Sequence, residues 1–278
     1  MAATVGTEFD GIAEIYDSTR QPATEAELKA LSNELAECSI ILDVGVGTGR
    51  FAKPLLDFGF RIVGIDFSLK MMVKARRKGV QNLVLADAHQ MPFRDRSFDA
   101  SIIVHVLHLI PDWRNVTSEM GRVTKNKVVA LLTNRLRELN KPANLPGYER
   151  VTIPPFHELW TLYAQLREEM GYPIRRNRRM WQNEEEIRSE IPPTKLVKVS
   201  DEVFVMGIND LIRRFRLRSY PMHQDIPPEV HEKIIQRLQS SITQGNDNVK
   251  RLASALIEGK IERRIVEELA VWRPDQLQ

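Results

Sequence analysis

The feature that most constrains this fold is an apolar run that ends in an acid and is followed by three alternating glycines. Residues 40–50 read IILDVGVGTGR, after which an amphipathic segment begins. This pattern is typical of a buried strand, a tight turn and the start of a helix. Because glycine has no side chain, a ligand can lie against such a turn, where the free N–H groups at the helix start can bind it. We therefore expect a ligand site at this junction.

The glycine spacing restricts which ligand the turn can accept. A dinucleotide fingerprint needs G-x-G-x-x-G, whereas here Gly45, Gly47 and Gly49 alternate and Arg50 stands where the last glycine should be. The sequence also lacks the G-K-[S/T] of a P-loop. Asp43 would repel a pyrophosphate, and it favours a ligand that carries an ammonium or sulfonium group. The alternative is a purely structural strand-to-helix turn.

Two further acids end short apolar segments that we predict to be strands. Asp66 ends residues 60–66 and lies 19 residues after Gly47, where a carboxylate can accept the two hydroxyl groups of a ribose. Asp87 belongs to residues 82–88 and suits an adenine amino group. Ligands of an open α/β sheet bind beyond the carboxyl ends of its strands, so all three acids would share one edge. For each acid alone, a strand-end cap or turn former is the alternative.

Taken together, these motifs resemble class I S-adenosylmethionine-dependent methyltransferases, in the methyltransferase domain 11 branch that alkylates small molecules. Residues 9–17 are similar to the family's N-terminal lid helix, and the resemblance covers about residues 8–135. The matching motifs are DxGxGxG at 43–49, GIDFS at 64–68 with MM at 71–72, DAHQMPF at 87–93 with SFD at 97–99, and HVLH at 105–108 before PDW at 111–113.

The resemblance implies S-adenosylmethionine as cofactor, S-adenosylhomocysteine as product, and a role for each motif. Asp43 would lie near the methionine amino group, Asp66 would bind the ribose, and Asp87 would contact the adenine edge. His105 would lie near the sulfonium and the substrate. Tyr16 would close over the methionine end, with helix packing as its alternative. The expected cofactor-binding residues are Tyr16, Asp43, Gly45, Val46, Gly47, Gly49, Asp66, Phe67, Ser68, Met71, Asp87, Ala88 and His105.

The order of the predicted elements indicates an α/β fold. Residues 8–37 have helical periodicity, and strands then alternate with helices to about residue 132, which favours a doubly wound, mostly parallel sheet. We expect helices to begin near Thr48 and Ser68, which are good N-caps. By resemblance, the sheet has seven strands, with residues 264–272 as an antiparallel last strand and a helical insertion after the fifth strand.

The region inserted after the fifth strand is the expected substrate cover. Residues 138–192 would form this cover, and residues 1–137 and 193–278 would form the Rossmann-like core that binds S-adenosylmethionine. Arginine runs at 175–179 and 213–218 would suit a carboxylate or phosphate of the substrate, or they lie on solvated helix faces and loops. The candidate substrate residues are His157, Trp160 and Arg179.

The composition argues against several other classes of protein. Lys and Arg number 40 against 37 Asp and Glu, and the net charge of +3 does not favour nucleic-acid binding. The single cysteine excludes an internal disulfide and fits a reducing cytoplasm, and without a Cys–His spacing we expect no metal. The N-terminus shows no signal-peptide core, and the longest apolar stretch, residues 100–110, is too short to span a bilayer. We expect a cytoplasmic protein without membrane contact and leave its oligomeric state open.

Methyl transfer from a sulfonium is an in-line displacement in which the protein mainly aligns the acceptor and excludes water. A base helps only where the acceptor must lose a proton. His105 is the candidate catalytic residue, with a structural hydrogen bond as its alternative.

The sequence favours a small-molecule acceptor, methylated on O, N or C. The [N/D]-P-P-[Y/F/W] motif of enzymes that methylate base amines is absent at 104–107. Enzymes that methylate carbon 5 of pyrimidines need a cysteine nucleophile, but Cys38 precedes the first strand and so lies away from the ligand edge. Two alternatives stay open: an RNA or protein methyltransferase that uses the arginine runs as a landing surface, and a regulator that binds the cofactor without turnover.

Overall fold

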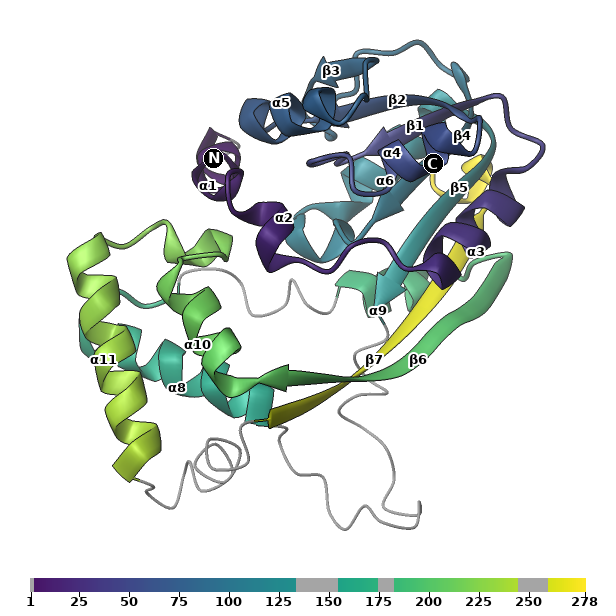
Figure 1. Ribbon diagram of the computed structural model, residues 1–278. Coiled ribbons are helices and arrows are strands. Elements are labelled where there is room, and N and C mark those ends of the chain that lie inside the picture. Colours follow the sequence, from purple (N-terminus) through teal and green to yellow (C-terminus); the bar gives the residue numbers. More distant parts are fainter. Residues whose placement is uncertain (1–2, 134–154, 175–182, 245–259) are drawn as a thin grey trace, which may run out of the picture. The chain divides into compact units, whose positions relative to one another are not determined.

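The protein forms an α/β fold around one seven-stranded sheet. The computed structural model describes residues 3–133, 155–174, 183–244 and 260–278 (Figure 1). The strand order is β3-β2-β1-β4-β5-β7-β6. The first five strands pair in parallel where they are neighbours, and β7 pairs antiparallel with β5. The expected doubly wound, mostly parallel sheet with an antiparallel last strand is therefore confirmed.

The elements have the following bounds. The strands are β1 (Ile40–Val44), β2 (Arg61–Asp66), β3 (Leu83–Leu85), β4 (Phe98–Val104), β5 (Thr124–Thr133), β6 (Lys195–Gly207) and β7 (Lys260–Trp272). The α-helices are α1 (Ala3–Ile12), α2 (Tyr16–Thr19), α3 (Glu25–Leu35), α4 (Ala52–Asp57), α5 (Leu69–Arg77), α6 (Trp113–Val123), α8 (Pro155–Glu169), α9 (Asn183–Glu190), α10 (Ile208–Arg216) and α11 (Pro228–Gln244). Short 3₁₀ turns are η1 (Leu107–Leu109), η3 (Pro221–His223) and η4 (Pro274–Gln276).

Helices cover both faces of the sheet. Neighbouring residues of a strand point to opposite faces, so one strand can contribute to a core on each side. On β1, Leu42 packs in a cluster with Trp113 and Met120 of α6. The adjacent Ile41 packs in a second cluster, with Leu31 of α3 and Leu55 of α4. The central strands are therefore apolar on both faces, as in parallel sheets buried between two layers of helices.

The strand order reverses between β1 and β4. From β1 the sheet continues to β2 and β3 on one side, while β4 and β5 continue on the other. Open α/β sheets bind their ligands at the carboxyl ends of the strands that flank such a reversal. The glycine turn follows β1 directly and His105 follows β4 directly, so the fold brings both to this edge.

The chain divides into two compact units. Residues 201–265 fall in the second unit and residues 177–192 in the first, so these bounds differ from those expected for the core and the cover. That any part of the chain covers the substrate stays a prediction. The first unit comprises Met1–Asn134, Asn177–Ser200 and Val266–Gln278, and the second comprises Arg135–Arg176 and Asp201–Ile265.

The second unit has a core of its own, which explains the difference. Leu159 and Tyr163 of α8 pack with Phe215 of α10 and Leu238 of α11. The hydroxyl oxygen of Tyr163 also lies 3.0 Å from Nδ1 of His231, inside this core. Because α10 and α11 bury their apolar faces against α8, the three helices form a unit with its own core.

Of the two expected helix starts, one is confirmed and one is wrong. Ser68 caps α5, and its Oγ accepts a hydrogen bond from the N–H of Met71 at 3.3 Å. The helix after the glycine turn begins at Ala52 and not near Thr48. The glycines of the turn hold positive φ angles that a helix cannot continue, and the Thr48 hydroxyl donates to Asp17 Oδ1 at 2.6 Å instead of capping.

Candidate functional site

The glycine turn after β1 packs tightly at two positions and is open at the third. Gly45, Gly47 and Gly49 have φ angles of 75°, 54° and 76°. A Cβ atom on Gly45 would lie 2.8 Å from a methyl group of Val106, and one on Gly49 would lie 3.0 Å from a methyl group of Val80. A Cβ on Gly47 would meet only the carbonyl oxygen of Gly45, at 4.0 Å. Space for a ligand is therefore found beside Gly47.

Asp43 is a buried acid without a protein partner. It is 3% exposed, and its carboxyl group forms no hydrogen bond or ion pair with any residue that the structure describes. Burial, together with the negative charge of Asp66, raises the pKa of Asp43 to about 7. A carboxyl group in this position fits a ligand that brings a positive charge, because such a charge would favour the ionised form.

Asp66 holds the glycine turn in place. Its Oδ2 accepts from the N–H of Gly47 at 2.8 Å, and its Oδ1 accepts from the N–H of Ser68 at 2.8 Å. Burial raises the pKa of Asp66, against these hydrogen bonds, which lower it. A carboxylate has about four lone pairs, so both oxygens keep acceptor capacity for a ligand. Its contact with ribose stays a prediction.

The third acid lies at the exposed rim beyond β3. Asp87 Oδ1 accepts from the N–H of His89 at 2.9 Å and lies 2.6 Å from Nδ1 of the same residue. Partial burial raises the pKa of Asp87, but the contacts with His89 outweigh it and leave the pKa lowered. Ala88 is partly buried beside the main core. Phe67, which is 41% exposed, meets the edge of Phe9 with ring centroids 6.4 Å apart.

The N-terminal helices are fixed to the elements around the glycine turn. Asp10 Oδ1 accepts from the Ser68 hydroxyl at 2.6 Å and from the N–H of Lys70 at 3.1 Å. Figure 1 shows α1 beside α5. Met71 is covered there by Ile12 and other residues of this segment, so the structure gives it a packing role.

Tyr16 begins α2, the second of these helices. The guanidinium of Arg20 lies 5.0 Å from the centre of its ring. Asp17, the next residue, accepts from Thr48 in the loop that follows the glycine turn. The structure therefore ties the start of α2 to that loop, while closure of Tyr16 over a ligand stays a prediction.

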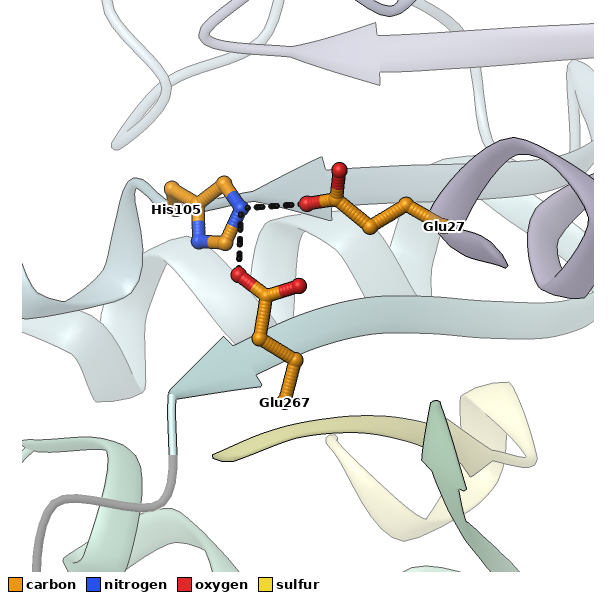
Figure 2. A group of neighbouring side chains, drawn as sticks. All are labelled: Glu27, His105 and Glu267. Carbon is orange, nitrogen blue, oxygen red and sulfur yellow. Dashed lines mark hydrogen bonds and ion pairs between the residues drawn. The ribbon is translucent and has the colours of Figure 1, made fainter. Parts of the chain in front are cut away.

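His105 lies beside two carboxylates that the sequence analysis did not single out. Figure 2 shows its Nε2 directed at Glu27 of α3 and at Glu267 of β7. The Nε2 atom lies 3.1 Å from Glu27 Oε1 and 3.5 Å from Glu267 Oε1. The backbone of His105 is left-handed, with a φ of 55°, and its ring contacts that of Phe51.

The two carboxylates have opposite pKa shifts. Burial raises the pKa of Glu267 to about 7, with a further contribution from the charge of Glu27. Burial also acts to raise the pKa of Glu27, but hydrogen bonds from His105 and Thr24 outweigh it and lower the pKa to about 2. At neutral pH Glu27 is therefore ionised, whereas Glu267 can retain a proton.

One local signal in the sequence could have identified Glu27. Thr24 and Glu27 form a capping box, a T-x-x-E pattern that predicts a buried, oriented glutamate at the third helical position. Glu267 offers no such signal, because its neighbour Glu268 is equally acidic and pairs instead with Arg188 at 2.7 Å. Which of two adjacent acids faces a site depends on strand register.

The three candidate substrate residues are not brought together by the described structure. Arg179 lies outside the described residues, and only the backbone of His157 is described, in α8. Trp160 packs in the second unit, with its ring 4.4 Å from that of Phe215 and 4.8 Å from that of Tyr220. This packing is the core position that was its alternative, and its substrate role stays a prediction.

The comparison with protein families agrees with this geometry. The model of a methyltransferase domain matches residues 42–132, which run from β1 to β5 and include all three acids and His105. Residues 42–132 are thus similar to the methyltransferase domain family. The cofactor contacts of the glycine turn and of the acids stay predictions.

Curated relatives match the same part of the chain. Demethylmenaquinone methyltransferase of Paenarthrobacter aurescens is 34% identical over 128 residues, which are 44% of this chain and 51% of that protein. Phosphatidylethanolamine N-methyltransferase of Cereibacter sphaeroides is 34% identical over 128 residues, 43% of this chain and 63% of that protein. The chain thus spans about half to two thirds of the length of these relatives.

Solved structures are similar over a comparable share of the chain. A SAM-dependent methyltransferase from Thermotoga maritima is 28% identical, with a TM-score of 0.41, and covers 46% of this chain and 62% of that one. Magnesium protoporphyrin IX methyltransferase from Synechocystis, solved with bound SAM, is 19% identical, with a TM-score of 0.37. The match covers 47% of this chain and 72% of that one. The fold assignment therefore rests on the strand order and pairing described above.

No helix in the described part of the chain combines the length and the apolar character needed to cross a membrane.

Proposed function

We propose that this protein transfers a methyl group from S-adenosylmethionine to a small-molecule acceptor. The observation that carries the proposal is the buried carboxyl group of Asp43, which has no partner among the described residues and whose ionisation is opposed by the charge of Asp66, the acid bound to the N–H of Gly47. A cofactor with an ammonium and a sulfonium group would supply a positive charge to these two buried acids.

The chain's own residues would hold the cofactor in the order in which the strands deliver them. Asp43 would take its amino group, Asp66 its ribose hydroxyls, and Asp87 with Phe67 its adenine. When bound, the cofactor supplies a methyl group that is already activated for displacement. The protein then has to align the acceptor and exclude water, which can account for up to ~7–11 kcal/mol of the barrier. His105, at the end of β4, is the side chain that we place next to the acceptor.

The relatives support a small-molecule acceptor. The two named above act, by their names, on a demethylated quinone and on a phospholipid, so the family's acceptors range widely in size and polarity. Methylation of RNA or protein is less well supported, because two arginines of the second run form hydrogen bonds within the second unit. Arg218 donates to the carbonyl oxygens of His223 and Ile226, and Arg216 to Glu232.

The ribose assignment of Asp66 gives a direct test of cofactor binding. We expect Asp66→Ala to abolish the binding of S-adenosylhomocysteine measured by calorimetry, because the variant loses both the predicted ribose contact and the hydrogen bond that shapes the turn at Gly47. The exposed Asp57, which pairs with Lys53 on α4, provides the control, and Asp57→Asn should bind normally. Unchanged affinity of the Asp66 variant would contradict the assignment.

Turnover and acceptor class need a second experiment. The protein would be incubated with methyl-labelled S-adenosylmethionine and a fractionated cell extract. Label in small molecules supports the proposal, and label in RNA or protein supports the macromolecular alternative. Cofactor binding without any transferred label would instead indicate a regulator.

A further inference from the structure

We propose that Glu27, His105 and Glu267 bind a divalent first-row transition-metal ion, such as Zn²⁺ or Mn²⁺. The three side chains come from α3, from the end of β4 and from β7, and they converge on one point (Figure 2). All three belong to the first unit. The site goes beyond the proposed methyl transfer and does not depend on it.

The spacing of the ligand atoms fits coordination to a single ion. His105 Nε2 lies 3.1 Å from Glu27 Oε1 and 3.5 Å from Glu267 Oε1, and the three ligand atoms all lie within 4.8 Å of one another. Nitrogen and oxygen ligands at about 2.0–2.2 Å from one zinc ion are about 3.0–3.6 Å apart in tetrahedral or octahedral geometry. A small rotation of either glutamate side chain closes the remaining distance.

Each carboxylate is held by a second partner on the side away from His105. Glu27 Oε2 accepts from the N–H of Thr24 at 2.6 Å, and Glu267 Oε2 accepts from the Ser200 hydroxyl at 3.4 Å. Metal-binding carboxylates are commonly oriented by hydrogen bonds of this kind. One oxygen of each glutamate is therefore fixed by the fold, and the other is turned toward the imidazole.

The charge and the donor set indicate the class of ion. Two carboxylates converge with one imidazole, and Glu27 is buried while His105 and Glu267 are partly buried. A divalent cation would balance the charge of both acids. Mg²⁺ and Ca²⁺ prefer all-oxygen sites, whereas a mixed nitrogen and oxygen set suits zinc, manganese or iron.

The expectation of no metal came from spacing along the chain. Glu27 and His105 are 78 positions apart, and Glu267 comes from the last strand. Short ligand patterns cannot reveal such a set. Three protein ligands also leave coordination positions for water or a substrate atom, as in catalytic rather than structural sites.

The test is calorimetric titration of the tag-free, full-length protein with Zn²⁺ or Mn²⁺ alone, with Mg²⁺ as the contrasting ion. We expect one Zn²⁺ or Mn²⁺ per chain, with much weaker binding of Mg²⁺. Glu27→Gln, His105→Asn and Glu267→Gln should each weaken binding by about 100-fold. These variants preserve the fold, because glutamine keeps the capping box and asparagine tolerates the left-handed backbone of His105.

Matched controls separate this site from adventitious binding at the surface. Glu25→Gln lies on the same helix but is exposed, and His89→Ala removes a histidine paired with Asp87. Both should bind the ion as the wild type does. The proposal is overturned if the wild type binds neither ion, or if the three ligand variants bind as well as the controls. Titration of the same samples with S-adenosylhomocysteine tests the proposed function separately.

Discussion

Asp43 brings an acid into an apolar strand end where nothing in the described structure compensates its charge. The carboxyl group lies at the end of β1, where burial and the charge of Asp66 both oppose its ionisation. Natural proteins rarely leave a buried acid without a partner unless a ligand supplies one. The buried carboxylate of Asp43 lowers the stability of the ligand-free protein, and a bound cation would offset this loss.

The pH dependence of stability follows from the same shift. Because folding raises the pKa of Asp43 from 3.8 to about 7, its contribution is fully present below pH 4 and is lost as the pH rises through 7. Each pKa unit is worth about 1.4 kcal/mol, so the loss is at most ~4 kcal/mol. Asp43→Asn should be more stable than the wild type at pH 8 and similar at pH 4, and it should bind S-adenosylhomocysteine weakly.

Urea unfolding of the ligand-free protein at both pH values measures this difference. The exposed Asp57→Asn variant corrects for unrelated changes with pH. If the Asp43 variant and the wild type differ equally at pH 4 and pH 8, the carboxyl group is not the cause.

The three glycines of the turn serve different purposes, and alanine substitutions should separate them. Gly45→Ala would force a Cβ to 2.8 Å from Val106 and should cost about 1–3 kcal/mol of stability. Gly47→Ala meets no atom closer than 4.0 Å, so only the strain of its positive φ applies, about 1–2 kcal/mol. The added methyl group would instead occupy the space of the ligand. We expect Gly47→Ala to lose cofactor binding while remaining folded.

Thermal unfolding and calorimetry on both variants test this separation. A Gly47→Ala protein that binds S-adenosylhomocysteine with wild-type affinity would show that the ligand does not lie against this glycine.

At the scale of elements, the N-terminal helices are joined to the elements around the glycine turn by the packing of Ile12 against Met71 and by a few polar contacts. Asp10 binds Ser68 and Lys70 at the start of α5, and Asp17 binds Thr48 after the glycine turn. Each of these hydrogen bonds to a carboxylate is worth about 1.5–3 kcal/mol. If the segment is a lid, opening it has to break these bonds.

Removing these contacts should loosen the segment selectively. We expect Asp10→Ala combined with Asp17→Ala to increase hydrogen exchange over residues 8–17 and to weaken S-adenosylhomocysteine binding by about tenfold. The exposed Asp57, whose carboxylate pairs with Lys53 within α4, supplies the control, and Asp57→Asn should change neither measurement. Faster exchange with unchanged affinity would mean that the segment does not close over the cofactor.

Local patterns in the sequence predicted the elements whose signals are themselves local. The apolar run, the glycines and the Ser68 cap each lie within a few residues, and the structure bears out β1, the turn and α5. Thr48 does not cap a helix because its hydroxyl donates to Asp17, 31 positions away in the sequence. Glu267 was missed for a similar reason, since only the register of β7 against β5 decides which acid faces His105. Such contacts depend on the tertiary fold.

For the whole molecule, the division into two units separates cofactor binding from the stability of the helical unit. Arg167 is buried in the second unit and donates to the carbonyl oxygens of Tyr172 and Met222, at 2.8 and 2.5 Å, and to Asp225 at 3.1 Å. The residues expected to bind the cofactor all lie in the first unit. Damage to one unit should therefore leave the binding function of the other intact.

Arg167→Met tests this independence. Methionine fills part of the space but leaves buried acceptors unsatisfied, so we expect the second unit to lose about 3–5 kcal/mol. Hydrogen exchange should rise in α8, α10 and α11, while S-adenosylhomocysteine affinity stays unchanged. Arg216→Met, which removes an exposed pair with Glu232, is the control. A parallel loss of affinity would show that the units are coupled.

The position of β7 between β5 and β6 affects how the protein is made. β5 ends at Thr133, but its antiparallel neighbour begins only at Lys260, so a ribosome must add most of the second unit before that strand exists. Until then β5 is an edge strand whose unpaired N–H and C=O groups can pair with strands of other chains. We expect translation products that stop short of β7 to aggregate or to bind chaperones, whereas in the finished chain β7 pairs with β5.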